Sequence, residues 1–143
     1  MVPVAKLLIG LAAVLLLAWL HHGPLGNGQR FVDRLESGAR AAIVQSELPG
    51  ISVTMQRDPL ARVAILAGPA NDFQRNGMGS QKGLTQMVDD VPGMAMARWA
   101  DEPQSGFVLP LLAESCLIAL VAYAISLALA WLFWGRKPRD RYA

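Results

Sequence analysis

Two apolar segments, one near each end of the 143-residue chain, enclose a polar stretch of domain size. Residues 7–20 carry no charge, and residues 107–134 contain one acid, Glu114. A membrane-spanning helix needs about 20 mainly apolar residues. The second segment exceeds that length, and the first reaches it when residues 2–5 are counted. Residues 21–106 hold most of the charged side chains, so the sequence predicts two membrane-spanning helices around one extramembrane domain.

Basic residues predict how the chain is oriented. Short flanks rich in lysine and arginine stay on the cytoplasmic side of a membrane. A basic tail, residues 136–143, follows the second apolar segment, residues 107–135, and Lys6 flanks the first. We therefore expect both termini in the cytoplasm and the domain of residues 23–106 outside it. Tryptophans and histidines near the segment ends are typical of interfacial anchors: Trp19, His21, His22, Trp131 and Trp134.

The first 22 residues have a second interpretation. A short apolar core after a single lysine is also typical of a secretory signal peptide, which is removed from the mature protein. Trp19-Leu20-His21-His22, however, lacks the small residues of a cleavage site. We therefore interpret residues 1–22 as an uncleaved transmembrane anchor and keep the signal peptide as the alternative.

Charge and residue content narrow the class of protein. Residues 21–106 are close to charge balance, so they lack the clustered basic face of a nucleic-acid-binding protein. The single cysteine, Cys116, cannot form an intrachain disulfide or a cysteine metal cluster. His21 and His22 are adjacent and lack the i, i+4 spacing with which a helix presents two metal ligands. We predict a protein without enzymatic activity, cofactor, metal or nucleic-acid partner.

The first half of the middle domain predicts one helix and a hairpin. Apolar residues at helical spacing begin at Phe31, and Leu48-Pro49-Gly50 ends this helix. Alternating apolar and polar residues over 51–56 predict a strand. A second apolar run, residues 62–67, predicts the return strand of the hairpin.

The second half predicts another helix and a third strand. Asn71-Asp72 fits a helix cap, although nearby glycines weaken the early part of this helix. The helical pattern is firm from 84 to 91, Pro92-Gly93 stops it, and residues 94–99 read as a strand. The order α-β-β-α-β predicts an α+β domain, a small sheet with helices on one face.

This element order resembles the BON domain of bacterial envelope proteins. The resemblance covers about residues 29–100. An apolar-x-Gly step closes the hairpin strand at Leu66-Ala67-Gly68. An apolar-x-Gly-apolar step closes the second helix at Val91-Pro92-Gly93-Met94. The spacing of these two steps carries the resemblance.

Two features depart from the BON pattern. The glycine usual in the hairpin turn is absent from residues 57–61, and residues 76–83 look like a glycine-rich insertion. The resemblance implies a protein of the bacterial inner membrane with its domain in the periplasm. It also implies binding of phospholipid surfaces or of envelope proteins, and no catalytic residues.

Glu114 lies inside the second apolar segment, where an ionisable group usually has a partner or a function. As a helix, residues 107–134 would be about 42 Å long, which exceeds a hydrocarbon core of about 30 Å. Glu114 then fits at the outer interface. The alternatives are a pair with His21 or His22 across an antiparallel helix pair, or with a basic group of another protein.

A stripe of small residues follows the second apolar segment at intervals of three or four: Ser115, Ala119, Ala122, Ser126 and Ala130. Small residues let a neighbouring helix approach closely. The stripe indicates either packing within the chain or docking onto an integral membrane protein complex. We favour an accessory, stabilising or assembly subunit of such a complex. The alternative is an envelope-maintenance module that faces membrane lipids or the cell wall.

Overall fold

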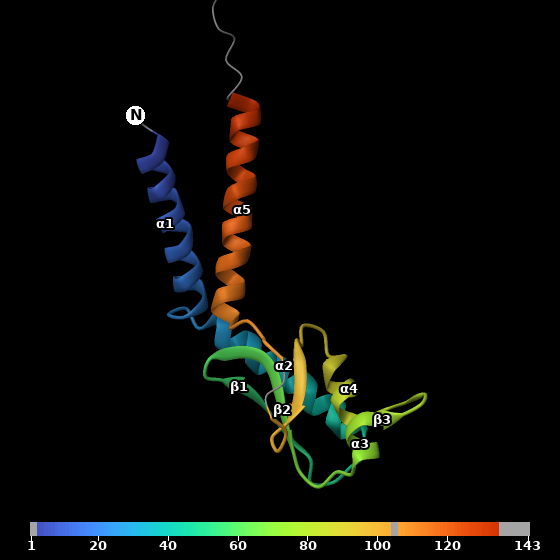
Figure 1. Ribbon diagram of the computed structural model, residues 1–143. Helices are drawn as coiled ribbons and strands as arrows, with labels where there is room; N and C mark the ends of the chain where they lie inside the picture. Colours follow the sequence, from blue (N-terminus) through green and yellow to red (C-terminus); the bar gives the residue numbers. More distant parts are fainter. Residues whose placement is uncertain (1–2, 104–105, 135–143) are drawn as a thin grey trace, which may run out of the picture.

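Two long apolar helices and a small sheet domain make up the protein (Figure 1). The computed structural model describes residues 3–103 and 106–134. Its elements are, in order, α1 (Pro3–His22), α2 (Asn27–Gln45), β1 (Ser52–Arg57), β2 (Leu60–Ala67), α3 (Asp72–Asn76), β3 (Gly77–Met78), β4 (Gln81–Lys82), α4 (Leu84–Asp89), β5 (Met96–Trp99) and α5 (Leu111–Trp134). The predicted α+β class is therefore confirmed, with one apolar helix before the sheet region in the sequence and one after it.

The main sheet has the strand order β1-β2-β5. Strands β1 and β2 pair antiparallel, with Ser52 opposite Ala67, and β2 pairs parallel with β5, with Val63 opposite Met96. A parallel pair needs a crossover connection, and α4 lies within it. The predicted order α-β-β-α-β is present as α2, β1, β2, α4 and β5.

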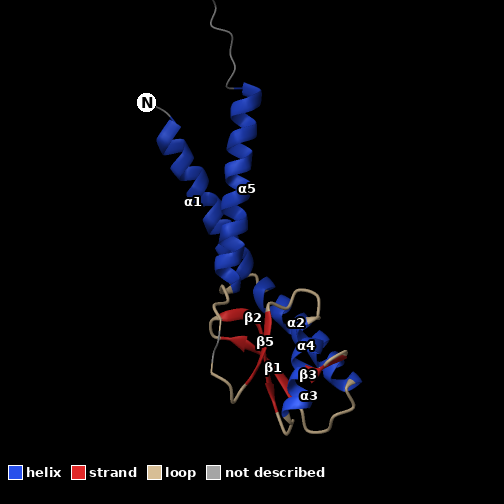
Figure 2. Cartoon of the chain, turned by 45° about the vertical axis from the view of Figure 1, so that its right-hand side comes forward, coloured by secondary structure: helices blue, strands red, loops and turns tan. Residues whose placement is uncertain are grey.

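Helices α2 and α4 cover one face of this sheet (Figure 2). Helix α2 turns a stripe of apolar residues toward the strands, among them Val32 and Leu35, because residues three or four apart share a helix face. The largest fully buried side chain is Trp99 on β5. Its indole N–H donates to Thr85 Oγ1 at 3.1 Å, and the Arg75 guanidinium stacks on its ring at 4.3 Å.

The predicted second helix is interrupted. The cap at Asn71 is confirmed, because its side chain accepts from the Gln74 N–H and the Gln74 side chain accepts from the Asn71 N–H. Helix α3 then ends at Gly77, whose φ of 74° belongs to the left-handed region that favours glycine. Here the chain forms the short hairpin β3–β4, and a Cβ at Gly77 would lie 2.2 Å from the Gln81 carbonyl oxygen. The glycine-rich segment is therefore a hairpin between two short helices.

Helices α1 and α5 leave the sheet domain on the same side and diverge away from it (Figures 1 and 2). Within them, Val4–His22 and Leu111–Phe133 are long and apolar enough to cross a membrane, and neither is buried inside the protein. Helix α5 begins four residues later than predicted, since Pro110 provides the first carbonyl, which accepts from the Glu114 N–H at 3.1 Å. The predicted basic tail lies outside the described residues.

Candidate functional site

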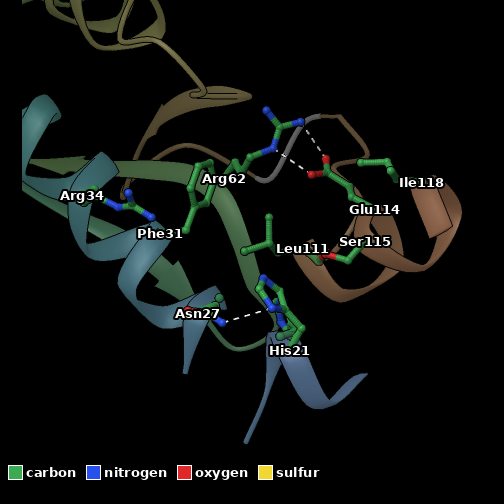
Figure 3. Close-up of a pocket in the computed structure, with 11 residues that line it drawn as sticks. His21, Asn27, Phe31, Arg34, Arg62, Leu111, Glu114, Ser115 and Ile118 are labelled. Atoms are coloured by element: carbon green, nitrogen blue, oxygen red, sulfur yellow. Dashed lines mark hydrogen bonds and ion pairs between the residues drawn. The ribbon is translucent and has the colours of Figure 1, made fainter. Parts of the chain in front are cut away.

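A cleft of about 530 Å³ lies where α1, α2, β2 and α5 meet (Figure 3). We call it the junction cleft. Its wall combines aromatic and aliphatic side chains with histidines, arginines and one carboxylate: His21, His22, Asn27, Gly28, Phe31, Arg34, Arg62, Leu111, Glu114, Ser115 and Ile118. The cleft is therefore at the base of the two apolar helices, beside the sheet domain.

A bidentate ion pair joins the sheet to α5 at this cleft. Arg62 Nε donates to Glu114 Oε2 at 2.9 Å, and the Arg62 Nη2 donates to Oε1 at 2.7 Å (Figure 3). Arg62 also donates to the Gly93 carbonyl at 2.9 Å. Bidentate arginine–carboxylate pairs fix geometry as well as charge. Hydrogen bonding to Glu114 raises the pKa of Arg62 above its ordinary value, so this guanidinium stays charged.

The Arg62–Glu114 pair identifies the partner of the acid in the second apolar segment. Its partner is an arginine of the same chain's sheet domain, so the alternative pair with His21 or His22 is wrong. Both side chains are sheltered, with 29% of Arg62 and 21% of Glu114 exposed. An ion pair of this kind compensates the acid that opens an otherwise apolar helix.

The two histidines fix the turn between α1 and α2. Asn27 Nδ2 lies 3.2 Å from His21 Nδ1 (Figure 3). His22 packs against Gly28. A Cβ at Gly28 would lie 2.6 Å from His22 Cε1 and 3.0 Å from the His22 carbonyl oxygen, so a larger residue here would displace the His22 ring. This contact lets α2 begin at Asn27, earlier than its apolar pattern predicts.

Helices α1 and α5 also contact one another directly. The Tyr123 hydroxyl donates to the Leu7 carbonyl at 2.8 Å, and a Cβ at Gly10 would lie 2.8 Å from the same hydroxyl oxygen. Glycine at this position allows the tyrosine to reach the backbone of α1. The contact joins positions 116 residues apart in the chain.

The predicted small-residue stripe divides into two parts. Ser115 and Ala119 are half-buried near the base of the helix pair, whereas Ala122, Ser126 and Ala130 are exposed. The two serine hydroxyls donate within α5, to the carbonyls four residues earlier, so they need no outside partner. The outer part of the stripe is uncovered by α1.

The predicted interfacial anchors lie at the ends of the apolar helices. Trp19 is 51% exposed and Trp131 is 67% exposed. Trp134 is the last residue of α5, and its side chain lies outside the described residues. His21 is exposed and His22 is half-buried at the sheet end of α1.

The junction cleft combines charged side chains with apolar ones. In residues 3–103 and 106–134, no three histidine, cysteine or acidic side chains gather as metal ligands would. Cys116 is a free, half-buried thiol on α5. The cleft therefore presents cationic and apolar surface around an ion pair that is already satisfied.

Sequence reasoning missed Arg62 and Tyr123 because their partners are distant in the chain. Arg62 appears in the sequence only as a polar residue at the start of a predicted strand, 52 positions before Glu114. Alternation along β2 places it on the same sheet face as Ala64 and Leu66. The one signal in the sequence was Glu114, because an acid in an apolar segment usually has a basic partner.

Comparison of the chain with protein families, with curated proteins and with solved structures found no match.

Proposed function

We propose that this chain is a non-enzymatic protein of the bacterial inner membrane with a BON-like domain in the periplasm. In this proposal it acts as an accessory, stabilising or assembly subunit of a larger membrane protein complex. Helices α1 and α5 cross the membrane, and both termini lie in the cytoplasm. The BON-like identity rests on the element order and on the two glycine steps that close β2 and α4.

One observation carries the proposal: α1 contacts α5 as far as Tyr123, about halfway along α5, and leaves the outer small residues of α5 exposed. The two helices contact one another through Gly10 and Tyr123 and then diverge (Figure 1). The outer small residues Ala122, Ser126 and Ala130 stay exposed. Lipid gives little hydrophobic drive for helix association, so close packing on small residues must supply it. A helix of a partner protein fits this uncovered part of α5.

The junction supports the same role. The Arg62–Glu114 pair fixes the sheet domain against the first turn of α5. A partner that recognises both the helix and the domain then meets them in one relative orientation. Preorganised surfaces of this kind lose less entropy on binding.

The test is to fill the uncovered stripe. Changing Ala122 and Ser126 to leucine adds bulk where a partner helix would approach, and we expect the chain to separate from its complex. Copurification after mild detergent extraction, with mass spectrometry of the partners, measures this. Changing Ala124 and Ala128 to leucine is the matched control, because these exposed residues lie about 200° around the helix from the first pair.

The alternative function is a lipid-facing or cell-wall-facing module that the helices only anchor. It predicts the reverse result: the leucine changes are silent and deletion of residues 29–100 abolishes function. Retention of partners by the Ala122 and Ser126 variant, with loss on that deletion, would favour this alternative.

A further inference from the structure

A second cleft lies on the sheet face opposite α2 and α4, where the linker between β5 and α5 runs beside the strands. We call it the linker cleft. Its volume is about 530 Å³, and it shares no lining residue with the junction cleft. Ile65 on β2 and Arg98 on β5 form its floor, since they are paired in register, and Phe107 and Val108 of the linker form a wall.

Arg98, on β5, differs from the arginines on β1, β2 and α3. Arg57, Arg62 and Arg75 each face a carboxylate. Within residues 3–103 and 106–134, the Arg98 guanidinium has no hydrogen bond or ion pair, and its Nε is closed off from solvent. A buried donor without an acceptor costs free energy, and the cost is larger for a charged group. No acceptor among the described residues binds the Arg98 Nε–H, and solvent does not reach this nitrogen.

Of the two arginines that line the linker cleft, Arg98 is the one without a carboxylate partner among the described residues. Arg57 is also in the lining, but Asp33 and Glu36 bind it at 2.9 and 2.8 Å. Asp58, the acid in the lining, is exposed on the hairpin turn, where water screens it. A ligand that enters the cleft meets an uncompensated guanidinium.

The apolar part of the cleft indicates the kind of ligand. Phe107 is 86% exposed, although an aromatic ring is among the side chains that gain most from burial. Arginine and aromatic residues together are enriched at the centres of protein–protein interfaces. A guanidinium prefers a carboxylate, with which it can form two parallel hydrogen bonds.

We propose that the linker cleft binds a segment of a partner protein that places an aspartate or glutamate carboxylate at Arg98 and an apolar side chain against Phe107. This inference rests on the proposed function, because the partner is the membrane complex in which the chain is a subunit. It adds a second contact, outside the membrane, to the contact along α5. It also names the chemistry of the partner surface: acidic with an adjoining apolar residue.

The first test converts Arg98 into a chemical probe. Arg98→Lys in the full-length protein places a primary amine in the cleft, and a carbodiimide joins an amine to a carboxylate that it contacts. We expect treatment of native membranes to link this position to an acidic peptide of another protein, which mass spectrometry identifies. Arg98→Gln carries no amine and is the control. Coupling only within the chain, or no coupling, would overturn the proposal.

The second test measures retention of the complex. Arg98→Glu reverses the charge and should reduce the copurified partner by at least about tenfold, the effect of losing one buried charged contact. Arg30→Glu is the matched control, because Arg30 is exposed and its side chain has no partner among the described residues. Amide hydrogen exchange of β5 checks that both variants remain folded.

The outcomes separate this inference from the proposed function. If the leucine changes on α5 release the partner and Arg98→Glu does not, the function stands and the cleft proposal falls. If no complex exists but the introduced amine couples to another protein, the cleft proposal stands and the subunit role falls. A phosphatidylglycerol molecule retained by the wild type and lost by Arg98→Glu would assign the cleft to a lipid headgroup and overturn the proposal.

Discussion

The sheet domain and the helix pair distribute their apolar residues in opposite ways. In the sheet domain, Val32 and Val88 are fully buried and charged side chains lie outside. In α5, Leu117 and Ile118 are 54% and 71% exposed. Water drives the burial of the first set, whereas the second set is stable only where the surroundings are themselves apolar. The sheet domain is therefore suited to water, and the exposed apolar surface of α5 is suited to apolar surroundings.

The boundary between these regions lies at the first turn of α5. Leu111, the first residue of that helix, is 8% exposed and belongs to the hydrophobic core of the sheet domain. Glu114, one turn later, pairs with Arg62. The base of α5 is thus part of the domain, and the rest of α5 is not.

The largest expected difference between the two regions is in the response of the unfolding free energy to a leucine-to-alanine substitution. Leu66→Ala removes a fully buried side chain from β2 and should lower the free energy of unfolding of the sheet domain by about 3 kcal/mol. Leu117→Ala, on the exposed side of α5, should change it by less than about 0.5 kcal/mol. Urea unfolding of the full chain in detergent, followed by hydrogen exchange of the β1–β2 amides, measures both. Equal effects would remove the distinction between the two regions.

A smaller effect is expected at the joint between the regions. Glu114→Gln leaves the Arg62 guanidinium without its carboxylate and should reduce the protection of α5's first turn by about 1–3 kcal/mol. Hydrogen exchange at the amides of residues 114–117 measures it, because the Glu114 N–H is the first in α5 to donate to a helical carbonyl, that of Pro110. The control is Glu36→Gln, which weakens pairs made by the largely exposed Arg40 and Arg57 on the domain surface. Unchanged protection at residues 114–117 in Glu114→Gln, or an equal loss in the control, would contradict a fixed joint.

The smallest effect is a pH dependence confined to the sheet domain. Burial raises the pKa of Asp89 above its ordinary value of 3.8, so its charged form costs stability once the pH exceeds the raised pKa. Asp89→Asn keeps an acceptor oxygen for the Ala97 N–H and removes this charge. We expect the variant to equal the wild type below pH 3.8 and to gain on it as the pH rises above that value.

Asp101 provides the opposite sign. Hydrogen bonds from Arg75 lower the pKa of Asp101 below 3.8, so its contribution is present above that value and lost as the pH falls through the lowered pKa. Asp101→Asn should therefore be less stable than the wild type at neutral pH, with the difference vanishing in acid. Chemical denaturation across a pH series measures both variants, and a shared sign would contradict the assignment.

The local patterns of the sequence predicted the element types and their order. Helical spacing predicted α2, and alternation predicted β1, because each pattern depends only on neighbouring residues. The first and last residues of the elements were predicted less well where glycines occur. Gly26, with φ of 68°, lets α2 begin at Asn27, and the β3–β4 hairpin occupies a segment whose glycines indicated only a weak helix.

The functional residues were harder to predict for a physical reason. Glu114 was identified because an acid in an apolar segment is unusual, yet its partner Arg62 is set by how β2 lies against the base of α5. Arg98 gave no signal at all, since an arginine on a strand normally points to solvent. The structure is needed to show that Phe107 and Val108 line the same cleft and that the Arg98 Nε has no hydrogen-bond acceptor.

The distance in sequence between Arg62 and Glu114 has a consequence for how the chain is made. A ribosome produces Arg62 first, and 52 residues separate it from Glu114. All three strands of the main sheet are complete before Glu114 is synthesised. In the proposed topology, Glu114 can pair with Arg62 on emerging only if the sheet domain has already folded outside the cytoplasm. The same topology would couple the insertion of α5 to the earlier folding of the domain, because a misfolded domain would leave the Glu114 carboxylate without the Arg62 guanidinium.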